Sequence, residues 1–204
     1  SLPLVWEDPL LGRLPVETPG IYTLGGARQV GKSTLLKQWM RLLVEAGVSP
    51  TAVTYLTAEL ADDHHVLHRW IEDALGADAA GDLRFIVVDE VTYVERWDRA
   101  VKFLADAGLL ADTVLVLTGS DLGLLRDMRT YLPGRRGRSS EVDFHLHPLT
   151  WIQTCELTGA LTADERDAIS SGVSWDADAL SRDGWKRCWI ALDAFLRHGG
   201  FLTA

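Results

Sequence analysis

Short apolar runs alternate with longer amphipathic stretches through the first 150 residues of the chain. The runs at 20–24, 52–56, 84–90 and 112–120 are rich in Val, Ile, Leu and Tyr, which is typical of β-strands. The last two of these runs contain the uninterrupted apolar stretches FIVV and VLVL, as expected of strands covered on both faces of a sheet. A fifth strand is predicted at 141–149.

Helical patterns fill the intervals between these runs. Amphipathic periodicity predicts helices at 33–46, 64–75 and 94–108, and a glycine stands at the end of each. A further helix is expected from about 121. The regular alternation of strands and helices predicts an α/β fold built around a parallel sheet.

The pattern changes after residue 150. Helices are predicted near 150–158, 162–170 and 185–198, with an acidic stretch rich in Gly and Ser before the last of them. We therefore expect a core domain over 1–150 and a helical extension over 151–204, which would begin a lid or a linker to a further domain. The final HGGFLTA follows a helix directly, which favours a cut within a longer protein.

Composition and charge restrict the classes of function. Apolar residues make up 47% of the 204 residues, so the chain can bury a sizeable core. The formal net charge of −9 does not favour DNA as a partner through the overall field. No apolar run approaches the roughly 18 residues that cross a bilayer, and acids stand where a secretory signal would carry lysines. We expect a cytoplasmic protein with no membrane partner, in which Cys155 and Cys188 are free thiols.

The stretch YTLGGARQVGKSTLL contains a phosphate-binding pattern. Gly26, Gly31, Lys32 and Ser33 match G-x-x-x-x-G-K-[ST], between a predicted strand and a predicted helix. Glycines let backbone N–H groups approach phosphate oxygens, Lys32 would reach the β- and γ-phosphates, and Ser33 would offer its hydroxyl to Mg²⁺. The predicted phosphate-binding residues are Gly26, Ala27, Arg28, Gln29, Val30, Gly31, Lys32, Ser33 and Thr34.

Two acids follow the buried strand at 84–90. Asp89 stands where phosphate-binding loops are accompanied by an acid that holds Mg²⁺ through water. Glu90 follows it, and in additional-strand P-loop ATPases a Glu at this position polarises the attacking water. Glu90 can also be read as a solvated acid at the end of a strand.

Thr118 and Ser120 end the strand at 112–120. ATPases of this architecture place a polar sensor there, and because the chain contains no Asn, Thr118 or Ser120 must serve. The competing interpretation is a plain turn in which Ser120 caps the next helix. No lysine is followed two residues later by Asp, the pattern with which Ras-type GTPases read guanine, so ATP is the expected nucleotide.

Several motifs occur in a fixed order along the chain: GGARQVGKSTLL, FIVVDEV, RWDRAVKFLAD, VLVLTGSDLGLL, LPGRRGR and HPLTW. With these motifs the chain resembles AAA-like archaeal and bacterial ATPases of the STAND/ASCE type over about 13–156. The terminal FLRHGGF is similar to a segment just beyond the ATPase core of that family, which would extend the resemblance to 201. The resemblance implies a three-layer α/β/α P-loop NTPase fold with sheet order 5-1-4-3-2 and the nucleotide at the carboxyl ends of the strands. It also implies a C-terminal restriction-nuclease-like domain, which is absent from this chain. Gln153 stands where the family usually has Glu.

A basic stretch carries three interpretations. Its arginines are Arg126, Arg129, Arg135, Arg136 and Arg138. Arg135 fits the LPGR position of the family and could stabilise charge on the γ-phosphate, in cis or from a neighbouring subunit of a homo-oligomer. The alternatives are contact with nucleic acid and a solvated basic loop. A second cluster, His64, His65 and His68, could bind a metal but is more simply read as surface histidines.

These features together predict an ATP-binding and ATP-hydrolysing module of a larger protein. Lys32, Glu90, Thr118, Ser120 and Arg135 are the expected catalytic residues, and Ser33 and Asp89 the expected Mg²⁺ ligands. A nucleotide-dependent switch or scaffold with negligible hydrolysis would use the same residues. A small-molecule kinase is a third interpretation, which the adjacent Asp89 and Glu90 argue against and an arginine-bearing lid would favour.

Overall fold

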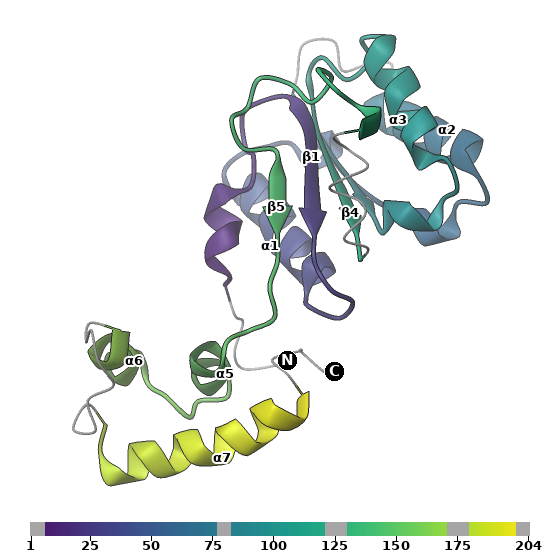
Figure 1. Cartoon of the computed structure of the whole chain (residues 1–204). Helices are drawn as coiled ribbons and strands as arrows, with labels where there is room; N and C mark the ends of the chain where they lie inside the picture. Colours follow the sequence, from purple (N-terminus) through teal and green to yellow (C-terminus); the bar gives the residue numbers. More distant parts are fainter. Residues whose placement is uncertain (1–6, 77–82, 121–129, 171–179, 199–204) are drawn as a thin grey trace. The chain divides into compact units, whose positions relative to one another are not determined.

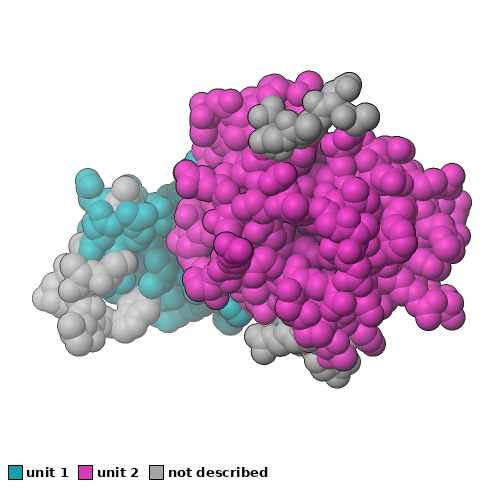
Figure 2. Space-filling view, turned by 90° about the horizontal axis from the view of Figure 1, so that it is seen from above, with its two compact units in different colours: residues 1–7, 147–204 teal, residues 8–146 magenta. Residues whose placement is uncertain are grey.

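The computed structural model describes residues 7–76, 83–120, 130–170 and 180–198. The chain separates into two compact units (Figure 2). The sheet unit comprises Asp8–Leu146, and the helical unit comprises His147–Ala204 together with Ser1–Glu7. The helix expected from about 121, with Arg126 and Arg129, falls largely outside the described residues.

The sheet unit is built on five strands (Figure 1): β1 (Gly20–Gly25), β2 (Val53–Thr57), β3 (Arg84–Asp89), β4 (Thr113–Gly119) and β5 (Asp143–His145). Every neighbouring pair is parallel, and the strand order is β2-β3-β4-β1-β5. Read from the opposite edge this is 5-1-4-3-2, so the expected topology is confirmed. Because the strands are parallel, their carboxyl ends meet at one edge of the sheet.

Helices cover both faces of this sheet. On one face, α1 (Lys32–Glu45) packs through Leu36 and Trp39 against a cluster that includes Phe85 and Val87 of β3. On the other face, α2 (His64–Leu75) and α3 (Trp97–Asp106) pack against a cluster that includes the alternate β3 residues Ile86 and Val88. β4 is buried along its whole length. These three layers explain why the central runs are apolar without alternation.

Within the sheet unit, two elements differ most in extent from the sequence prediction. The helix expected over 94–108 is preceded by a short 3₁₀ turn, Val91–Tyr93, and α3 begins only after Arg96, whose φ of 61° is left-handed. The strand expected over 141–149 is reduced to β5, whose neighbour Leu146 still donates its N–H to the Gly25 carbonyl at 2.9 Å. Pro148 has no N–H to donate, so it cannot continue the pairing.

The helical unit consists of α5 (Trp151–Leu157), α6 (Ala163–Ser170) and α7 (Arg182–His198). A capping box begins α5. The Thr150 hydroxyl accepts from the Gln153 N–H at 3.3 Å, and the Gln153 side chain accepts from the Thr150 N–H at 2.7 Å. Glu and Gln both serve at this position of a capping box, so the Gln153 that departs from the family pattern keeps a structural role here.

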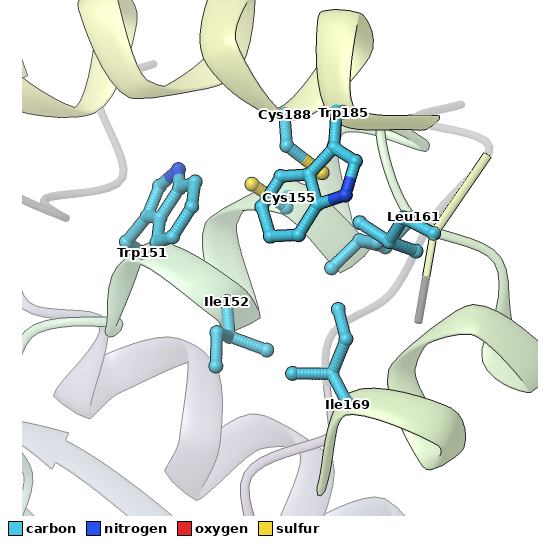
Figure 3. A pocket seen from close by; sticks show the side chains of 8 residues that line it. Trp151, Ile152, Cys155, Leu161, Ile169, Trp185 and Cys188 are labelled. Carbon is cyan, nitrogen blue, oxygen red and sulfur yellow. The ribbon is translucent and has the colours of Figure 1, made fainter. Parts of the chain in front are cut away.

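Apolar side chains of this unit surround a small hollow (Figure 3). It is lined by Trp151, Ile152, Cys155, Leu161, Ile169, Leu180, Trp185 and Cys188, and is too small to hold a water molecule. Cys155 and Cys188 are buried free thiols on α5 and α7, as predicted. Burial, reinforced by the neighbouring Cys188, raises the pKa of Cys155 to about 12. The hollow is therefore part of an apolar core and not a ligand site.

In the described part of the chain, no helix has the length and hydrophobicity that a bilayer span requires.

Candidate nucleotide-binding site

The loop between β1 and α1 has an unusual backbone. Gly26, Gln29 and Gly31 have φ values of 157°, 61° and 106°. A Cβ at Gly26 would lie 2.6 Å from the Leu146 carbonyl oxygen, so only glycine fits there. Left-handed residues interleaved with ordinary ones turn successive N–H groups toward one concave side, the geometry of an anion-binding nest. The φ values of this loop are compatible with the predicted phosphate-binding role.

The amino end of α1 has no side-chain cap. Gly31 is the N-cap residue and has no side chain that could accept from the first-turn N–H groups, and the first turn carries no acid. The other face of the sheet offers a contrast, because Asp63 caps α2 by accepting from the N–H groups of His65 and Val66 at 2.8 and 2.9 Å. An uncapped helix start has unsatisfied donors and a positive dipole end, which favour an anion.

Lys32 is the first residue of α1 and only 4% exposed. Its Nζ donates to the carbonyl oxygens of Gly26 and Ala27 at 3.0 and 3.2 Å and to Ser120 Oγ at 2.9 Å. It also lies 3.2 Å from Glu90 Oε1. The ammonium group is therefore held over the loop by groups that a phosphate could replace.

Asp89 ends β3 and is 5% exposed. Ser33 Oγ donates to Asp89 Oδ2 at 2.6 Å, Thr118 Oγ1 donates to Oδ1, and the Tyr55 hydroxyl also donates to Oδ2. Burial alone would raise the pKa of Asp89, but these three hydrogen bonds and the charge of Lys32 hold it below the ordinary value. The carboxylate is thus ionised at neutral pH.

Ser33 and Asp89 fit the ligand chemistry of Mg²⁺. Their hydroxyl and carboxylate oxygens are hard donors that already converge at 2.6 Å. Across the described residues, no group of three or more His, Cys, Asp and Glu side chains forms a metal cage. A Mg²⁺ ion that binds with nucleotide does not need one, because it usually takes one or two protein ligands together with waters and phosphate oxygens.

Glu90 follows Asp89 in a left-handed conformation, with φ 54° and ψ 45°. This conformation is uncommon for a residue other than Gly or Asn. Its N–H donates to Thr118 Oγ1 at 2.8 Å, and its carboxylate accepts from the Ser120 N–H at 3.1 Å and from Ser120 Oγ. The end of β4 thus fixes both the backbone and the side chain of Glu90, so the structure brings Thr118 and Ser120 into the predicted cluster.

Tyr55 joins this cluster, although the sequence reading treated it only as part of a strand. It lies in β2, opposite Val87 of β3, and its ring lies 5.8 Å from Lys37 Nζ. Burial and the nearby Asp89 carboxylate raise the pKa of Tyr55, which keeps the phenol protonated as a donor. The only feature of the sequence that could have indicated this contact is a hydroxyl-bearing aromatic residue in the strand next to that of Asp89.

The structure does not bring Arg135 to this cluster. Its guanidinium pairs with Asp106 at the end of α3 and donates to the Pro133 carbonyl at 3.2 Å. The adjoining Arg136 carbonyl accepts from the N–H of Ile21, near the start of β1, at 3.2 Å. The phosphate-binding loop follows the opposite end of β1. A catalytic role for Arg135 toward the nucleotide of a neighbouring subunit stays a prediction.

Arg136 has a structural role that none of the three interpretations of the basic stretch included. Its side chain is 11% exposed and pairs with Asp143 of β5. It also donates to the carbonyl oxygens of Ile21 and Val142 at 3.1 and 2.7 Å and to Thr23 Oγ1 at 3.2 Å. Arg136 thus ties β1 to β5 along the edge of the sheet.

The histidine cluster lies at the start of α2. The rings of His64 and His65 lie 4.1 Å apart, and His68 Nδ1 lies 3.8 Å from Glu72. Within the described ranges, no third ligand completes a metal site around them. The preceding Asp63 caps the helix, as its position suggested.

Comparisons with known proteins agree with this geometry. A family model described as AAA domain matches residues 18–155, more than half of the chain. The chain therefore belongs to the AAA domain family and carries an AAA-family P-loop ATPase domain.

A protein from Haemophilus influenzae described as uncharacterized is 27% identical over 144 residues. The match covers 66% of this chain and 33% of the relative, so the chain spans about a third of the relative's length.

Three solved structures resemble the fold. The Aeropyrum pernix ORC1 protein in complex with DNA has a TM-score of 0.57 at 17% identity, and the match covers 100% of this chain and 64% of that one. Cdc6p from Pyrobaculum aerophilum has a TM-score of 0.51 at 17% identity, with coverage of 94% and 60%. The Aeropyrum pernix ORC2 protein has a TM-score of 0.50 at 18% identity, with coverage of 93% and 60%. At these identities the likeness concerns the fold alone.

Proposed function

We propose that the sheet unit binds Mg·ATP and hydrolyses it to ADP and phosphate. The observation that carries the proposal is the convergence of Lys32, Ser33, Asp89 and Glu90 beside an uncapped helix start and an anion-binding loop. Each group comes from the carboxyl edge of the sheet, where open α/β sheets bind ligands.

The loop and α1 would bind the phosphates. The inward N–H groups and the helix dipole attract the phosphate oxygens. Lys32 exchanges its carbonyl acceptors and Glu90 for β- and γ-phosphate oxygens, and this exchange keeps its buried charge paired. Ser33 and Asp89 would hold Mg²⁺, with Asp89 acting through water. When bound, the ion neutralises charge on the phosphate oxygens.

Glu90 would position the attacking water. Once Lys32 turns to the phosphates, the Glu90 carboxylate keeps its hydrogen bonds from Ser120 and gains acceptor capacity for a water proton. Thr118 contacts both Asp89 and the Glu90 backbone, so it couples the metal-binding carboxylate to the catalytic one. In this proposal Thr118 and Ser120 are positioning residues.

A nucleotide-dependent switch with negligible hydrolysis is the second candidate. The observation that favours it is the engagement of Glu90, whose carboxylate is bound by Lys32 and twice by Ser120. If Lys32 stayed on Glu90 after nucleotide bound, no base would be free to activate water. The kinase interpretation loses support, because Arg135 and Arg136 lie toward the amino end of β1 and form no lid over the loop.

Glu90→Gln separates the two leading candidates. The exchange keeps size and hydrogen bonding but removes the base, so we expect Mg·ATP affinity within a fewfold of wild type. Turnover should fall roughly 100-fold or more, as for loss of a general base. The measurements are steady-state phosphate release and calorimetric binding. Glu95→Gln, which makes the same chemical change at an exposed site, is the control.

Equal turnover in wild type and Glu90→Gln would contradict the role of Glu90. Tight binding with no turnover in wild type would favour the switch.

The longer protein is the subject of further proposals. The resemblance to STAND/ASCE-type ATPases supports a restriction-nuclease-like domain after this chain, for which 151–204 would be a lid or linker, and a homo-oligomer in which Arg135 reaches a neighbour. One structural neighbour, the ORC1 protein, was solved with DNA. The formal net charge of −9 does not favour DNA as a partner of this chain. We place the protein in the cytoplasm.

A further inference from the structure

Arg28 lies within the phosphate-binding loop, and its side chain extends out of the loop. It is exposed, and it precedes Gln29, whose left-handed φ turns the loop. The guanidinium donates to the Tyr93 hydroxyl at 3.1 Å, and its central carbon lies 5.9 Å from the centre of the Tyr93 ring. Arg28 is therefore attached to a neutral phenol on a different segment of the chain.

The position of Tyr93 shows which part of the nucleotide Arg28 would face. Tyr93 ends the short turn that starts after Glu90, and its N–H donates to the Glu90 carbonyl at 3.1 Å. Under the proposed function, Glu90 holds the water that attacks the γ-phosphate. A side chain that bridges the loop to the Glu90 turn thus lies at the γ-phosphate end of the site.

The charge of Arg28 has no carboxylate partner among the described residues, unlike the charges of the three arginines that follow. Arg13, Arg135 and Arg136 each pair with a carboxylate. Over the described part of the chain, no carboxylate pairs with Arg28, whose recorded contacts are both with Tyr93. A cation–π contact at an exposed site is weak. A guanidinium–phosphate pair is charge-assisted and often bidentate, so a phosphate would compete well with Tyr93 for the Arg28 side chain.

We infer that Arg28 is a catalytic arginine supplied by the loop itself, which leaves Tyr93 when ATP binds and contacts the γ-phosphate. The inference rests on the proposed function. In hydrolysis, the bond from the bridging oxygen to the γ-phosphorus breaks and a bond from water oxygen to that phosphorus forms. The water proton passes to Glu90, and ADP and inorganic phosphate leave. Arg28 stays protonated and stabilises the charge on the transferring group.

The test compares ligands with and without a γ-phosphoryl group. Wild type, Arg28→Ala, Arg28→Lys and the control Arg69→Ala are titrated with Mg·ADP, and with Mg·ADP plus aluminium fluoride as a mimic of the transferring group. Arg69 is exposed on α2, away from the loop. Phosphate release is measured on the same proteins.

We expect Arg28→Ala to bind Mg·ADP within about twofold of wild type but to lose roughly 100-fold in affinity for the fluoride complex and in turnover. Arg28→Lys should recover only part of this loss, because an ammonium cannot bind bidentately. Arg69→Ala should match wild type.

Two results would overturn the inference and leave the proposed function standing. In the first, Arg28→Ala matches Arg69→Ala in fluoride-complex affinity and in turnover. In the second, Arg28→Ala loses as much affinity for Mg·ADP as for the fluoride complex. This result would mean that Arg28 supports nucleotide binding in general, or the fold, and does not act on the γ-phosphate. If wild type binds neither ligand, the proposed function fails and the inference fails with it. If wild type binds both ligands but does not hydrolyse ATP, the affinities of wild type and Arg28→Ala for the fluoride complex still test the inference.

Discussion

The two ends of the sheet in the sheet unit both hold cations against carboxylates, but they do so in different settings. Toward the amino end of β1, Arg136 pairs with Asp143 and donates to two backbone carbonyls, and Arg135 pairs with Asp106. At the carboxyl end, Lys32 pairs with Glu90 beside a loop with three left-handed residues and an uncapped helix start.

This difference shows that charge alone does not identify the binding site. Arg136 makes contacts between neighbouring strands, which hold the sheet edge together. Lys32 makes contacts with loop carbonyls and with Glu90, and the N-cap residue of its helix, Gly31, has no side chain to accept from the first-turn N–H groups. The backbone at the carboxyl end therefore distinguishes a site for an anion from an internal salt bridge.

The largest expected effect comes from breaking the amino-end pair. Arg136→Met removes the guanidinium that pairs with the largely buried Asp143, so the free energy of unfolding should fall by about 3 kcal/mol. Mg·ATP affinity per folded molecule should not change, because the loop lies at the other end of β1. Equilibrium urea unfolding and calorimetric binding measure the two quantities.

A second variant shows whether a loss of function in Arg136→Met results only from misfolding. Arg136→Met combined with Asp143→Leu removes both charges, and replacing a buried pair with apolar residues is often close to neutral. The double variant should recover much of the lost stability. If the folded double variant lost affinity for ATP, this would contradict the claim that the Arg136–Asp143 pair and the nucleotide site act independently.

A smaller effect is expected at Asp89. Asp89→Asn keeps the shape of the side chain but removes the charge that would hold Mg²⁺ through water. The gain in ATP affinity on adding Mg²⁺, measured against EDTA, should fall roughly 10- to 100-fold, as for outer-shell partners of metals. Asp73→Asn on the exposed face of α2 is the control. An unchanged Mg²⁺ dependence would remove Asp89 from the metal site.

The same variant has a consequence for pH. The pKa of Asp89 in the folded protein lies below its ordinary value of 3.8. The unfolded chain therefore takes up this proton first as pH falls, and the stability contributed by the carboxylate is present above about pH 4 and lost as pH drops through the folded-state pKa. Below pH 4 the unfolding free energy of wild type should consequently decline more steeply than that of Asp89→Asn.

The smallest effect is expected at Tyr55. Tyr55→Phe removes one of three hydrogen bonds to Asp89, a net change of about 1 kcal/mol or about fivefold in an equilibrium constant. The Mg²⁺-dependent part of ATP affinity should fall by about that factor, and affinity in EDTA should not change. A fall of equal size in EDTA would show that Tyr55 supports the fold and does not position Asp89.

Local sequence was sufficient for much of this account. The loop, Asp89, Glu90, Thr118 and Ser120 are each next to a strand end, and the parallel order of the strands brings such ends together. The sheet order itself came from the resemblance to AAA-like ATPases. The apolar runs thus predicted the strands and their parallel arrangement, and the resemblance supplied their order in the sheet.

The contacts that escaped prediction depend on side chains that meet across the fold. Tyr55 and Asp89 are 34 residues apart, and Arg136 and Thr23 are 113 residues apart. Neither pair belongs to a local motif, so the spacing of these residues in the sequence does not predict that they are in contact. Arg135 is the opposite case, in which a local motif suggested a contact that the fold does not form. Its place in the LPGR motif suggested a phosphate partner, but its side chain pairs with Asp106.

The central claim is that the loop around Lys32 is a working nucleotide site, and thermal unfolding with and without Mg·ATP tests it most directly. Each protein is compared with its own ligand-free state, and Lys102→Ala, an exposed lysine on α3, is the control for loss of charge. At a ligand concentration a hundredfold above Kd, wild type and Lys102→Ala should gain about 2.7 kcal/mol of stability, and Lys32→Ala should gain almost none. An equal gain in all three proteins would place the nucleotide elsewhere, and no gain in any of them would contradict the claim.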